Sequence, residues 1–355
     1  MIKITLPDGS VREYNEGVSA YEVAASISQG LAKAVLSAEV NGEVWDLTRP
    51  ITKDSSVKLL KFEDEWGKKT FWHSSAHLMA EAIETLFPGV KFWVGPPLDN
   101  GYYYDIDLGG QTLSEEDLQK VEKLMGELAK QDNKYVRSEM PKAEAVKYFT
   151  EKGDEYKLDL LGGLADGEIT FYKQGNFTDL CRGPHIPSTG YIKAIKLLNI
   201  AGAYWKGDSN NKQLTRIYGI TFPKQQQLDE YLAMLEEQKK RDHRVIGREL
   251  EIFAFDDEVG PGLPLWLPKG AAIIEKLEAL AKKNEHEQGY VRVKSPHIAK
   301  DALYLRSGHL PYYADSMFPP MELDGGKYYL KAMNCPHHHK IFGATPKSYR
   351  DMPLR

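Results

Sequence analysis

The sequence predicts an α+β protein built from several domains, and three observations favour this class. The chain has 355 residues, which is more than a single hydrophobic core usually organises. Short segments that alternate apolar and polar residues, as half-buried strands do, are interspersed with amphipathic helical patterns. The hydrophobic content of 42% and the charged content of 27% are those of an ordinary globular protein.

The first predicted unit covers residues 1–62 and begins with a hairpin. Residues 2–6 alternate apolar and polar side chains as a strand does. A Pro-Asp-Gly-Ser turn at 7–10 follows, and residues 11–14 return as the partner strand.

A helix and a second hairpin complete this unit. Ser19 and Glu22 form the pattern of a capping box at the start of the helix, and Gly30 suits the position after its end. The Asn-Gly dipeptide at 41–42 is a strong hairpin signal, and residues 51–62 supply a last strand. This order of elements is that of a ubiquitin-like β-grasp.

Residues 63–224 form the second predicted unit, an α+β domain entered through a polar segment at 63–69. A helix carries His73, an aromatic hairpin region covers 92–107, and Ser114 opens a second amphipathic helix. Further short strands are expected at 169–173, 192–200 and 214–218.

A connecting helix is predicted over residues 225–248. Its charged end, EEQKKRDHR, is typical of a solvated helix face, and a basic ledge near an RNA backbone is the alternative. From 249 to 355 an α+β pattern resumes, and the extended stretch at its end leads us to expect a fragment of a longer protein. Here we expect strands at 251–255 and 290–294, a loop at 261–270 and a helix at 270–288.

The overall composition narrows the class of protein. A formal net charge of −5 argues against a generally basic surface for nucleic acid, although local basic patches stay open. Two cysteines provide no disulfide framework, so we expect a reducing, cytoplasmic compartment. No apolar run approaches the ~18 residues of a membrane span, and the charged start of the chain is unlike a signal peptide.

Two clusters of His and Cys stand out in a chain with only ten His and two Cys. In the first, His73 and His77 lie one turn apart on a helix and project from the same side. The centre of that helix's apolar stripe lies roughly 120° away, so we expect both histidines to flank the core. Either histidine alone is more often a structural, hydrogen-bonded residue.

The second cluster is Cys181 and His185, with Asp179 beside them, and Gly183 and Pro184 place it in a loop. If the two clusters meet, they make a hydrolytic or metal-binding site. One chemistry is a zinc site of three His and one Cys, which four protein ligands would close. The other is metal-free hydrolysis, in which an imidazole or a polar network activates water. Spacing alone leaves both open, and a buried cysteine with a turn histidine is the structural alternative.

A further dense stretch at 329–339 contains Cys335 and the histidines at 337–339. A Cys thiolate with nearby imidazoles suggests zinc. The alternative is that Cys335 is a buried small hydrophobic residue.

With these pieces placed, the whole chain closely resembles the bacterial threonyl-tRNA synthetases, a family of class II aminoacyl-tRNA synthetases. Residues 1–62 resemble the family's TGS domain. Residues 63–224 resemble its editing domain, through HxxxH, CxxxH and the stretch AGAYWKGDSNNKQLTRIYG. Residues 249–355 resemble the first part of its antiparallel-sheet catalytic domain: VRVKSPHIAKDALYLRSGHL resembles motif 1, KAMNCPHHH the family's KPMNCPGH, and SYRDMPLR the lead-in to motif 2.

The resemblance implies roles for individual residues. Cys335 would be a ligand of a zinc ion in the synthetic site, and Met333 would lie near the amino-acid pocket. Ala332 and His337 depart from the family's Pro and Gly at this place. The editing site would consist of His73, His77, Asp179, Cys181 and His185, with Lys157 and Tyr104 as further members.

The implied activity is attachment of threonine to tRNA with ATP and Mg by a homodimer that holds one zinc per subunit. The implied editing activity is hydrolysis of mischarged seryl-tRNA. Our hypothesis is that His73 positions or deprotonates the water, while Cys181 and His185 hold the terminal adenosine or the water network. Motif 3, the motif 2 arginine and the other zinc ligands are missing from these residues, so we do not expect this chain alone to form an aminoacyl-adenylate.

Two rival functions remain. A free-standing trans-editing deacylase would need only the first two units, and residues 249–355 count against it. A zinc-stabilised RNA-binding module without catalysis is the second, and bound zinc without deacylase activity would favour it.

Overall fold

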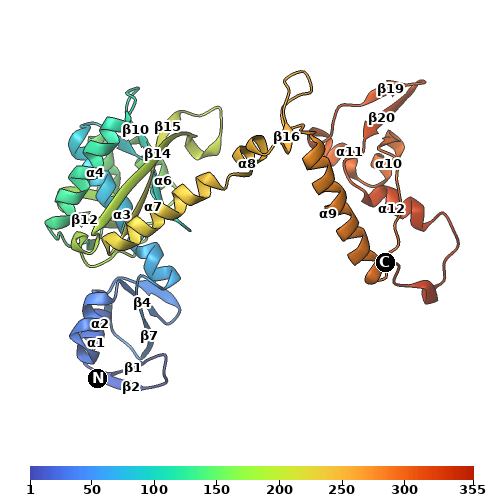
Figure 1. Ribbon diagram of the computed structural model, residues 1–355. Helices are drawn as coiled ribbons and strands as arrows, with labels where there is room; N and C mark the ends of the chain where they lie inside the picture. Colours follow the sequence, from blue (N-terminus) through green and yellow to red (C-terminus); the bar gives the residue numbers. More distant parts are fainter. The chain divides into compact units, whose positions relative to one another are not determined.

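The computed structural model describes all 355 residues, and the chain is α+β and multidomain, as predicted. It groups into two compact units, Met1–Lys239 and Lys240–Arg355 (Figure 1). The finer division into segments at 62, 224 and 248 stays a prediction. None of the helices combines the length and apolar character that crossing a membrane requires.

A mixed five-stranded sheet forms the first domain, in which β1 pairs parallel to β7 and the other neighbours are antiparallel. The dipeptide Asn41-Gly42 makes the predicted hairpin, and both residues have the positive φ angles that such a turn requires, 52° and 88°. The strand order is β2 (Val11–Tyr14), β1 (Ile2–Thr5), β7 (Ser55–Leu60), β4 (Ser37–Val40) and β5 (Glu43–Trp45), with a separate pair of β3 (Val18–Ser19) and β6 (Pro50–Ile51).

Two short helices complete this β-grasp (Figure 1). The predicted capping box of Ser19 and Glu22 opens α1 (Ala20–Ile27). The role predicted for Gly30 is wrong, because Ser28 ends α1 and at once caps α2 (Gln29–Ala34), so that Gly30 lies inside the second helix. The core between helices and sheet includes Ile4, Val23, Ala24, Val40, Leu47 and Val57.

The central domain is organised around one long helix, α3 (Glu65–Leu86). The predicted polar entry segment at 63–69 is not a separate linker, because α3 already begins at Glu65. At Gly67 the helix lies against the end of the β-grasp: a Cβ there would stand 1.8 Å from the carbonyl oxygen of Lys61. The two domains therefore adjoin without a flexible connection.

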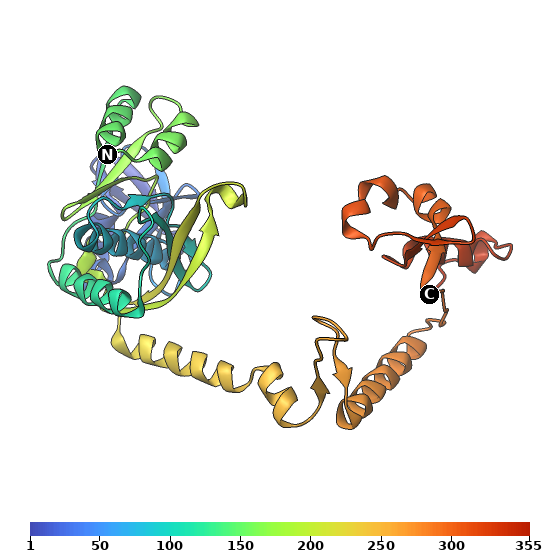
Figure 2. The ribbon, with the colours of Figure 1, turned by 90° about the horizontal axis from the view of Figure 1, so that it is seen from above.

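A second sheet packs against α3, and its long β14–β15 hairpin extends from the body of the domain (Figure 2). Helix α4 (Glu115–Lys130) packs on α3 and β14, with the cap at Ser114 and the buried apolar stripe that the sequence predicts. The strands run in the order β14 (Ala194–Tyr204), β15 (Gln213–Phe222), β10 (Gly101–Asp107) and β8 (Lys91–Phe92), and β9 (Pro97–Leu98) also pairs with β10.

A small three-stranded sheet and two helices form the remainder of the central domain. The helices α5 (Lys142–Lys152) and α6 (Glu155–Gly162) were not expected from the sequence. The sheet has the order β11 (Val136–Glu139), β12 (Thr170–Gln174) and β13 (Phe177–Leu180). The 3₁₀ turns are η1 (Thr189–Tyr191) and η2 (Trp205–Gly207).

The predicted helix over 225–248 is interrupted. Asp242 accepts a hydrogen bond from the backbone N–H of Arg244 and thereby starts a new helix. The two helices are α7 (Gln225–Lys240) and α8 (His243–Glu249).

The unit Lys240–Arg355 contains an antiparallel sheet of order β18 (Ile298–Lys300), β20 (Gly326–Leu330) and β19 (Met321–Leu323). The strand predicted at 290–294 is wrong, because these residues pair with no other strand. The N–H of Val291 donates a single hydrogen bond to the carbonyl of Arg355. The strand predicted at 251–255 shrinks to β16, and β17 lies within the predicted loop. The other elements are β16 (Phe253–Ala254), β17 (Leu265–Trp266), α9 (Pro268–Glu287), α10 (Asp301–Arg306), α11 (His309–Tyr312), η3 (Ala314–Ser316), α12 (Cys335–Phe342) and η4 (Tyr349–Asp351).

Candidate functional site

A pocket of about 560 Å³ opens in the central domain, between α3, β10, α6 and the loop that follows β13. Six of the seven residues predicted for the central site line it, and the seventh, His185, lies behind its wall with 1% of its surface exposed. The six are His73, His77, Tyr104, Lys157, Asp179 and Cys181.

The two histidines of α3 differ in their surroundings. His73 is half-buried at the pocket, as a residue flanking the core would be. The same expectation is wrong for His77, which is only 2% exposed because α3 is covered by the sheet, by α4 and by β13. The carbonyl of His77 accepts a hydrogen bond of 2.9 Å from Nε2 of Gln174, while its ring Nδ1 has no hydrogen-bond partner.

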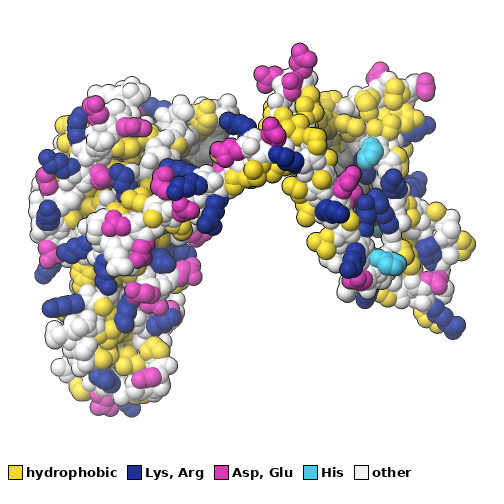
Figure 3. Space-filling model, viewed as in Figure 1, with side chains coloured by type: hydrophobic (Ala, Val, Ile, Leu, Met, Phe, Trp, Pro, Cys, Tyr) yellow, Lys and Arg dark blue, Asp and Glu magenta, His cyan; other side chains and the backbone are white.

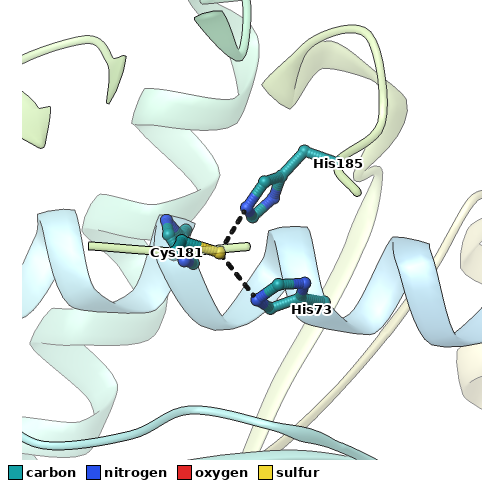
Figure 4. Close-up of side chains that lie close together, drawn as sticks. His73, Cys181 and His185 are labelled. Atoms are coloured by element: carbon teal, nitrogen blue, oxygen red, sulfur yellow. Dashed lines mark hydrogen bonds between the residues drawn. The ribbon is translucent and has the colours of Figure 1, made fainter. Parts of the chain in front are cut away.

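The thiol of Cys181 lies between two imidazole rings (Figure 4). Its sulfur is 3.2 Å from Nε2 of His73 and 3.3 Å from Nε2 of His185. The loop after β13 makes this possible: Gly183, at a φ of +72°, donates its backbone N–H to the same sulfur at 3.3 Å. His73 and Cys181, which are 108 residues apart in sequence, are therefore neighbours, and the condition for a shared site is met.

The hydrogen bonds of Ser74 determine the tautomer of His185. The single hydroxyl hydrogen of Ser74 is donated to the carbonyl of Thr70, at 2.8 Å. Its oxygen accepts the N–H of Ile186 at 3.0 Å and must therefore also accept a proton from Nδ1 of His185, at 3.0 Å. Consequently Nε2 of His185 carries no proton and can accept the S–H of Cys181.

Burial keeps these groups uncharged. Desolvation lowers the pKa of His73 to about 4. A hydrogen bond to the Pro184 carbonyl and the nearby Asp179 carboxylate raise this pKa, but by less than desolvation lowers it. Desolvation also lowers the pKa of His77 to about 3 and that of His185 well below its usual value. The same effect raises the pKa of the Cys181 thiol to about 12. At neutral pH the site therefore presents neutral imidazoles and a thiol instead of a thiolate.

A buried ion pair forms the opposite side of the pocket. Nζ of Lys157 lies 2.8 Å from Oδ2 of Asp179, and the hydroxyl of Tyr104 donates to the same oxygen at 2.5 Å. Burial by itself raises the pKa of Asp179, but the Lys157 ammonium, His77 and these hydrogen bonds outweigh it, so the pKa is lowered. The buried side of the pocket thus carries one negative and one positive charge, and the cationic side chains of Lys69 and Arg182 also line the pocket.

The ligand atoms of His73, His77, Cys181 and His185 all lie within 4.8 Å of one another, so this group could hold a metal ion. A tetrahedral zinc ion would set its N and S ligands about 3.5 Å apart, given the usual bond lengths. The two Cys–His distances of 3.2 and 3.3 Å agree with that spacing, and the unpartnered Nδ1 of His77 is a free ligand atom. The donor set therefore fits a closed zinc site.

Asp46 of the β-grasp also contacts the site, although no sequence pattern indicates this role. Its Oδ1 accepts the backbone N–H of His185 at 2.6 Å, and its Oδ2 accepts the hydroxyl of Tyr172 at 2.5 Å. The rings of Tyr172 and Tyr135 pack on His185, with centroids at 4.4 and 4.9 Å. No motif links these residues, because they come from separate elements.

The second predicted site, in the unit Lys240–Arg355, is less complete. Cys335 is exposed at the start of α12, and the chain holds no group of three or more metal-ligating side chains around it. Sδ of Met333 lies 3.3 Å from Nε2 of His309. The residues present do not by themselves make a zinc site, so Cys335 and Met333 stay predictions.

Comparison with known proteins gives two family matches. The family described as "TGS domain" matches residues 2–61, and "Threonyl and Alanyl tRNA synthetase second additional domain" matches residues 169–218. The second match includes Asp179, Cys181 and His185 of the central site.

Curated relatives match along the whole chain. The threonine–tRNA ligases of Cytophaga hutchinsonii, Porphyromonas gingivalis and Bacteroides fragilis are 59%, 56% and 53% identical to it. Each match covers 100% of this chain and 55% of the relative, so the chain spans about half the length of these relatives. A solved structure, the RNA binding domain of threonyl-tRNA synthetase from Cryptosporidium parvum Iowa II, is 36% identical over 32% of this chain and 28% of its own, with a TM-score of 0.31.

Proposed function

The chain belongs to the threonyl-tRNA synthetase family, and from this premise we propose that its central pocket is an editing site that hydrolyses mischarged seryl-tRNA. The observation that carries the proposal is the position of the Cys181 thiol between Nε2 of His73 and Nε2 of His185, at the wall of an open pocket.

Water is the nucleophile of the proposed reaction. With a pKa near 12 the sulfur of Cys181 stays protonated at neutral pH, and a thiol is a poor nucleophile. The water oxygen attacks the ester carbonyl carbon, the bond to the ribose oxygen breaks, and the proton that the water loses ends on that oxygen. Free serine and deacylated tRNA are the products.

His73 is the group that faces this water. Its pKa of about 4 leaves the imidazole neutral with a single N–H, which the Pro184 carbonyl accepts, so the other ring nitrogen can accept a hydrogen bond from water. A base with so low a pKa removes a proton only weakly, which favours orientation of the water over its full deprotonation. Because the substrate is an activated ester, a well-positioned water is sufficient.

The remaining residues hold the substrate and the water network. Lys157, fixed by Asp179, offers a positive charge in the pocket, and the Tyr104 hydroxyl completes that side. Cys181 and His185 maintain the wall opposite, on which the terminal adenosine or its water network rests.

The need for such a site follows from the chemistry of amino-acid selection. Serine keeps the hydroxyl of threonine and lacks one methyl group, which is worth roughly 1–3 kcal/mol, or about 10–200-fold, in discrimination. A second site that admits the smaller product and hydrolyses it supplies the missing accuracy.

By likeness to the threonine–tRNA ligases, about half of whose length this chain spans, we also propose the ligation of threonine to tRNA with ATP and Mg, in a homodimer with zinc bound through Cys335. The exposed apolar stripe of α9 supports the homodimer, because such a row of side chains is suited to a subunit contact. The stripe consists of Ile273, Leu277 and Leu280, which are 46%, 58% and 55% exposed.

The test is to present seryl-tRNA and threonyl-tRNA to this chain and to measure the release of each amino acid. We expect serine to be released at least tenfold faster than threonine. Release of neither amino acid by a folded protein, together with tightly bound zinc, would favour the RNA-binding module instead. The second unit, with its antiparallel sheet, argues against the free-standing deacylase.

A further inference from the structure

We propose that Asp46, on the β-grasp domain, positions the loop that carries Cys181 and His185, so that the first domain is a working part of the deacylase site. This inference rests on the proposed function of the pocket and names a positioning residue that acts through His185.

Both oxygens of the Asp46 carboxylate are used, and both bonds cross from one domain to the next. Oδ1 accepts the backbone N–H of His185 at 2.6 Å, and Oδ2 accepts the hydroxyl of Tyr172 at 2.5 Å. Burial raises the pKa of Asp46, and these two hydrogen bonds act against that rise. The two donors come from the loop after β13 and from β12.

Tyr172 connects the same carboxylate to the imidazole ring of His185. Its ring lies 4.4 Å from the ring of His185, centroid to centroid. Its hydroxyl also faces the loop at Gly183, where an added Cβ would stand 2.2 Å from the hydroxyl oxygen. Asp46 therefore determines where the backbone of His185 lies and, through Tyr172, how closely the loop approaches.

The chain of contacts continues from His185 to the thiol. With its backbone held by Asp46 and its Nδ1–H held by Ser74, the imidazole has one orientation, and its Nε2 faces the sulfur of Cys181 at 3.3 Å. That sulfur in turn lies 3.2 Å from His73. A small shift of the loop would separate the Cys181 sulfur from His73, because distances of this kind tolerate little change.

Contacts other than those of Asp46 also join the β-grasp to the central domain. The β-grasp also packs on the central domain through Phe62, whose ring is 5.0 Å from that of Phe71, and through Ser37, whose Oγ is 3.2 Å from the hydroxyl of Thr70. These contacts hold the domains together and lie on α3. We therefore expect loss of the Asp46 carboxylate to disturb the loop while the fold persists.

The experiment compares three variants of the full chain. Asp46→Ala removes both acceptors, whereas Asp46→Asn keeps an acceptor for the His185 N–H and places an amide N–H against Tyr172, whose hydroxyl oxygen can accept it. Asp54→Ala is the matched control, because Asp54 also accepts a backbone N–H, from Lys3 at 2.8 Å, within the β-grasp. Deacylation of seryl-tRNA is measured as kcat and KM, and the Tm of each variant is recorded.

We expect Asp46→Ala to lower kcat at least tenfold with KM changed less than threefold, Asp46→Asn to stay within threefold of the parent, and Asp54→Ala to match the parent. A folded Asp46→Ala protein with parental kcat overturns the inference. So does an Asp46→Asn protein that is as impaired as Asp46→Ala, since the geometry then does not account for the loss.

A second readout separates this inference from the proposed function. In protein labelled with ¹⁵N-histidine, the backbone amide of His185 is followed by NMR, with its resonance identified by its loss in His185→Gln. We expect its proton resonance to move upfield in Asp46→Ala and to stay near the parental position in Asp46→Asn. If the parent protein does not deacylate seryl-tRNA, the proposed function fails, and an unmoved amide in Asp46→Ala overturns the positioning role independently.

Discussion

Nζ of Lys157 lies 2.8 Å from Oδ2 of Asp179, and each side chain is less than one-twentieth exposed, at 3% and 4%. A charge in such surroundings is tolerated only while its partner is present, because its own desolvation is costly. The pair therefore makes the pocket sensitive to the loss of either member, although the two residues come from α6 and β13.

We expect Lys157→Met to destabilise the protein by about 3–5 kcal/mol, since it leaves the Asp179 carboxylate buried and unpaired. The free energy of unfolding, from urea titration followed by tryptophan fluorescence, measures the loss. Lys147→Met is the control, because Lys147 pairs with Glu151 at 4.0 Å with 78% of its side chain exposed, and such pairs contribute about 0–1 kcal/mol. Equal, small effects for both variants would contradict the argument.

Single substitutions His73→Ala and Cys181→Ala should each slow the deacylation of seryl-tRNA at least tenfold. The first removes the neutral imidazole that we propose orients water, and the second removes the thiol between the two rings. His243→Ala serves as a histidine control, because that side chain is 86% exposed and distant in sequence from the site. Parental rates for folded His73→Ala and Cys181→Ala proteins would refute the assignment.

The pH dependence of deacylation follows from the pKa of His73. Because burial lowers this pKa to about 4, the neutral, active imidazole is present throughout the range above pH 5 and is lost only as the pH falls through 4. We expect kcat, corrected for uncatalysed ester hydrolysis, to be flat from pH 5.5 to 8. A break near pH 6.5, the ordinary value for histidine, would mean that His73 is solvated or is not the group involved.

Removal of metal should leave deacylation unchanged. A zinc ion held by His73, His77, Cys181 and His185 would have four protein ligands, which leaves no position for water and removes His73 from the reaction. Treatment with 1,10-phenanthroline, with the metal content measured before and after, checks this. Loss of activity that returns with added zinc would show that the ion, and not the neutral imidazole, is required.

Gly183→Ala should impair both the site and the fold. The residue has a φ of +72°, and its new Cβ would meet the Tyr172 hydroxyl at 2.2 Å. We expect a loss of about 1–3 kcal/mol in the free energy of unfolding and a clear decrease in kcat. Gly167→Ala separates the two causes: Gly167 has a φ of +90° with no atom within 4 Å, so it should lose some stability and keep its deacylation rate.

Local signals predicted much of the β-grasp and the long helices. Turn chemistry located the hairpin at 41–42, and a capping box located the start of α1. The strand expected at 290–294 did not form, because alternation describes only the faces of a strand. A strand also needs a paired neighbour, and these residues belong to no sheet.

The failures in the central domain have a related cause. The helix α6 was missed because it buries Lys157, a residue that a pattern of apolar positions counts as a surface residue. His77 was predicted to lie at the edge of the core, because a helix pattern read alone implies one solvent-facing side. In the structure α3 is packed on several sides. The contact of Asp46 with His185 arises only when residues 139 positions apart fold together, and no motif marks it.

The net charge of the chain does not describe the charges that line the central pocket. Acidic and basic side chains are interspersed on the visible surface (Figure 3), in keeping with the net charge of −5. The charges that matter in the pocket are the few that are buried, above all Lys157 and Asp179.

The direct connection between the β-grasp and α3 limits where the protein can be truncated. Gly67 packs against the backbone of Lys61, and the ring of Phe71 packs against that of Phe62. Cutting the chain after residue 62 would therefore expose Gly67 and the ring of Phe71 to solvent. A recombinant piece that starts at residue 63 should aggregate, whereas residues 1–239 should behave as one transferable module. Grafting the central pocket onto another protein would require transferring the small N-terminal sheet together with it.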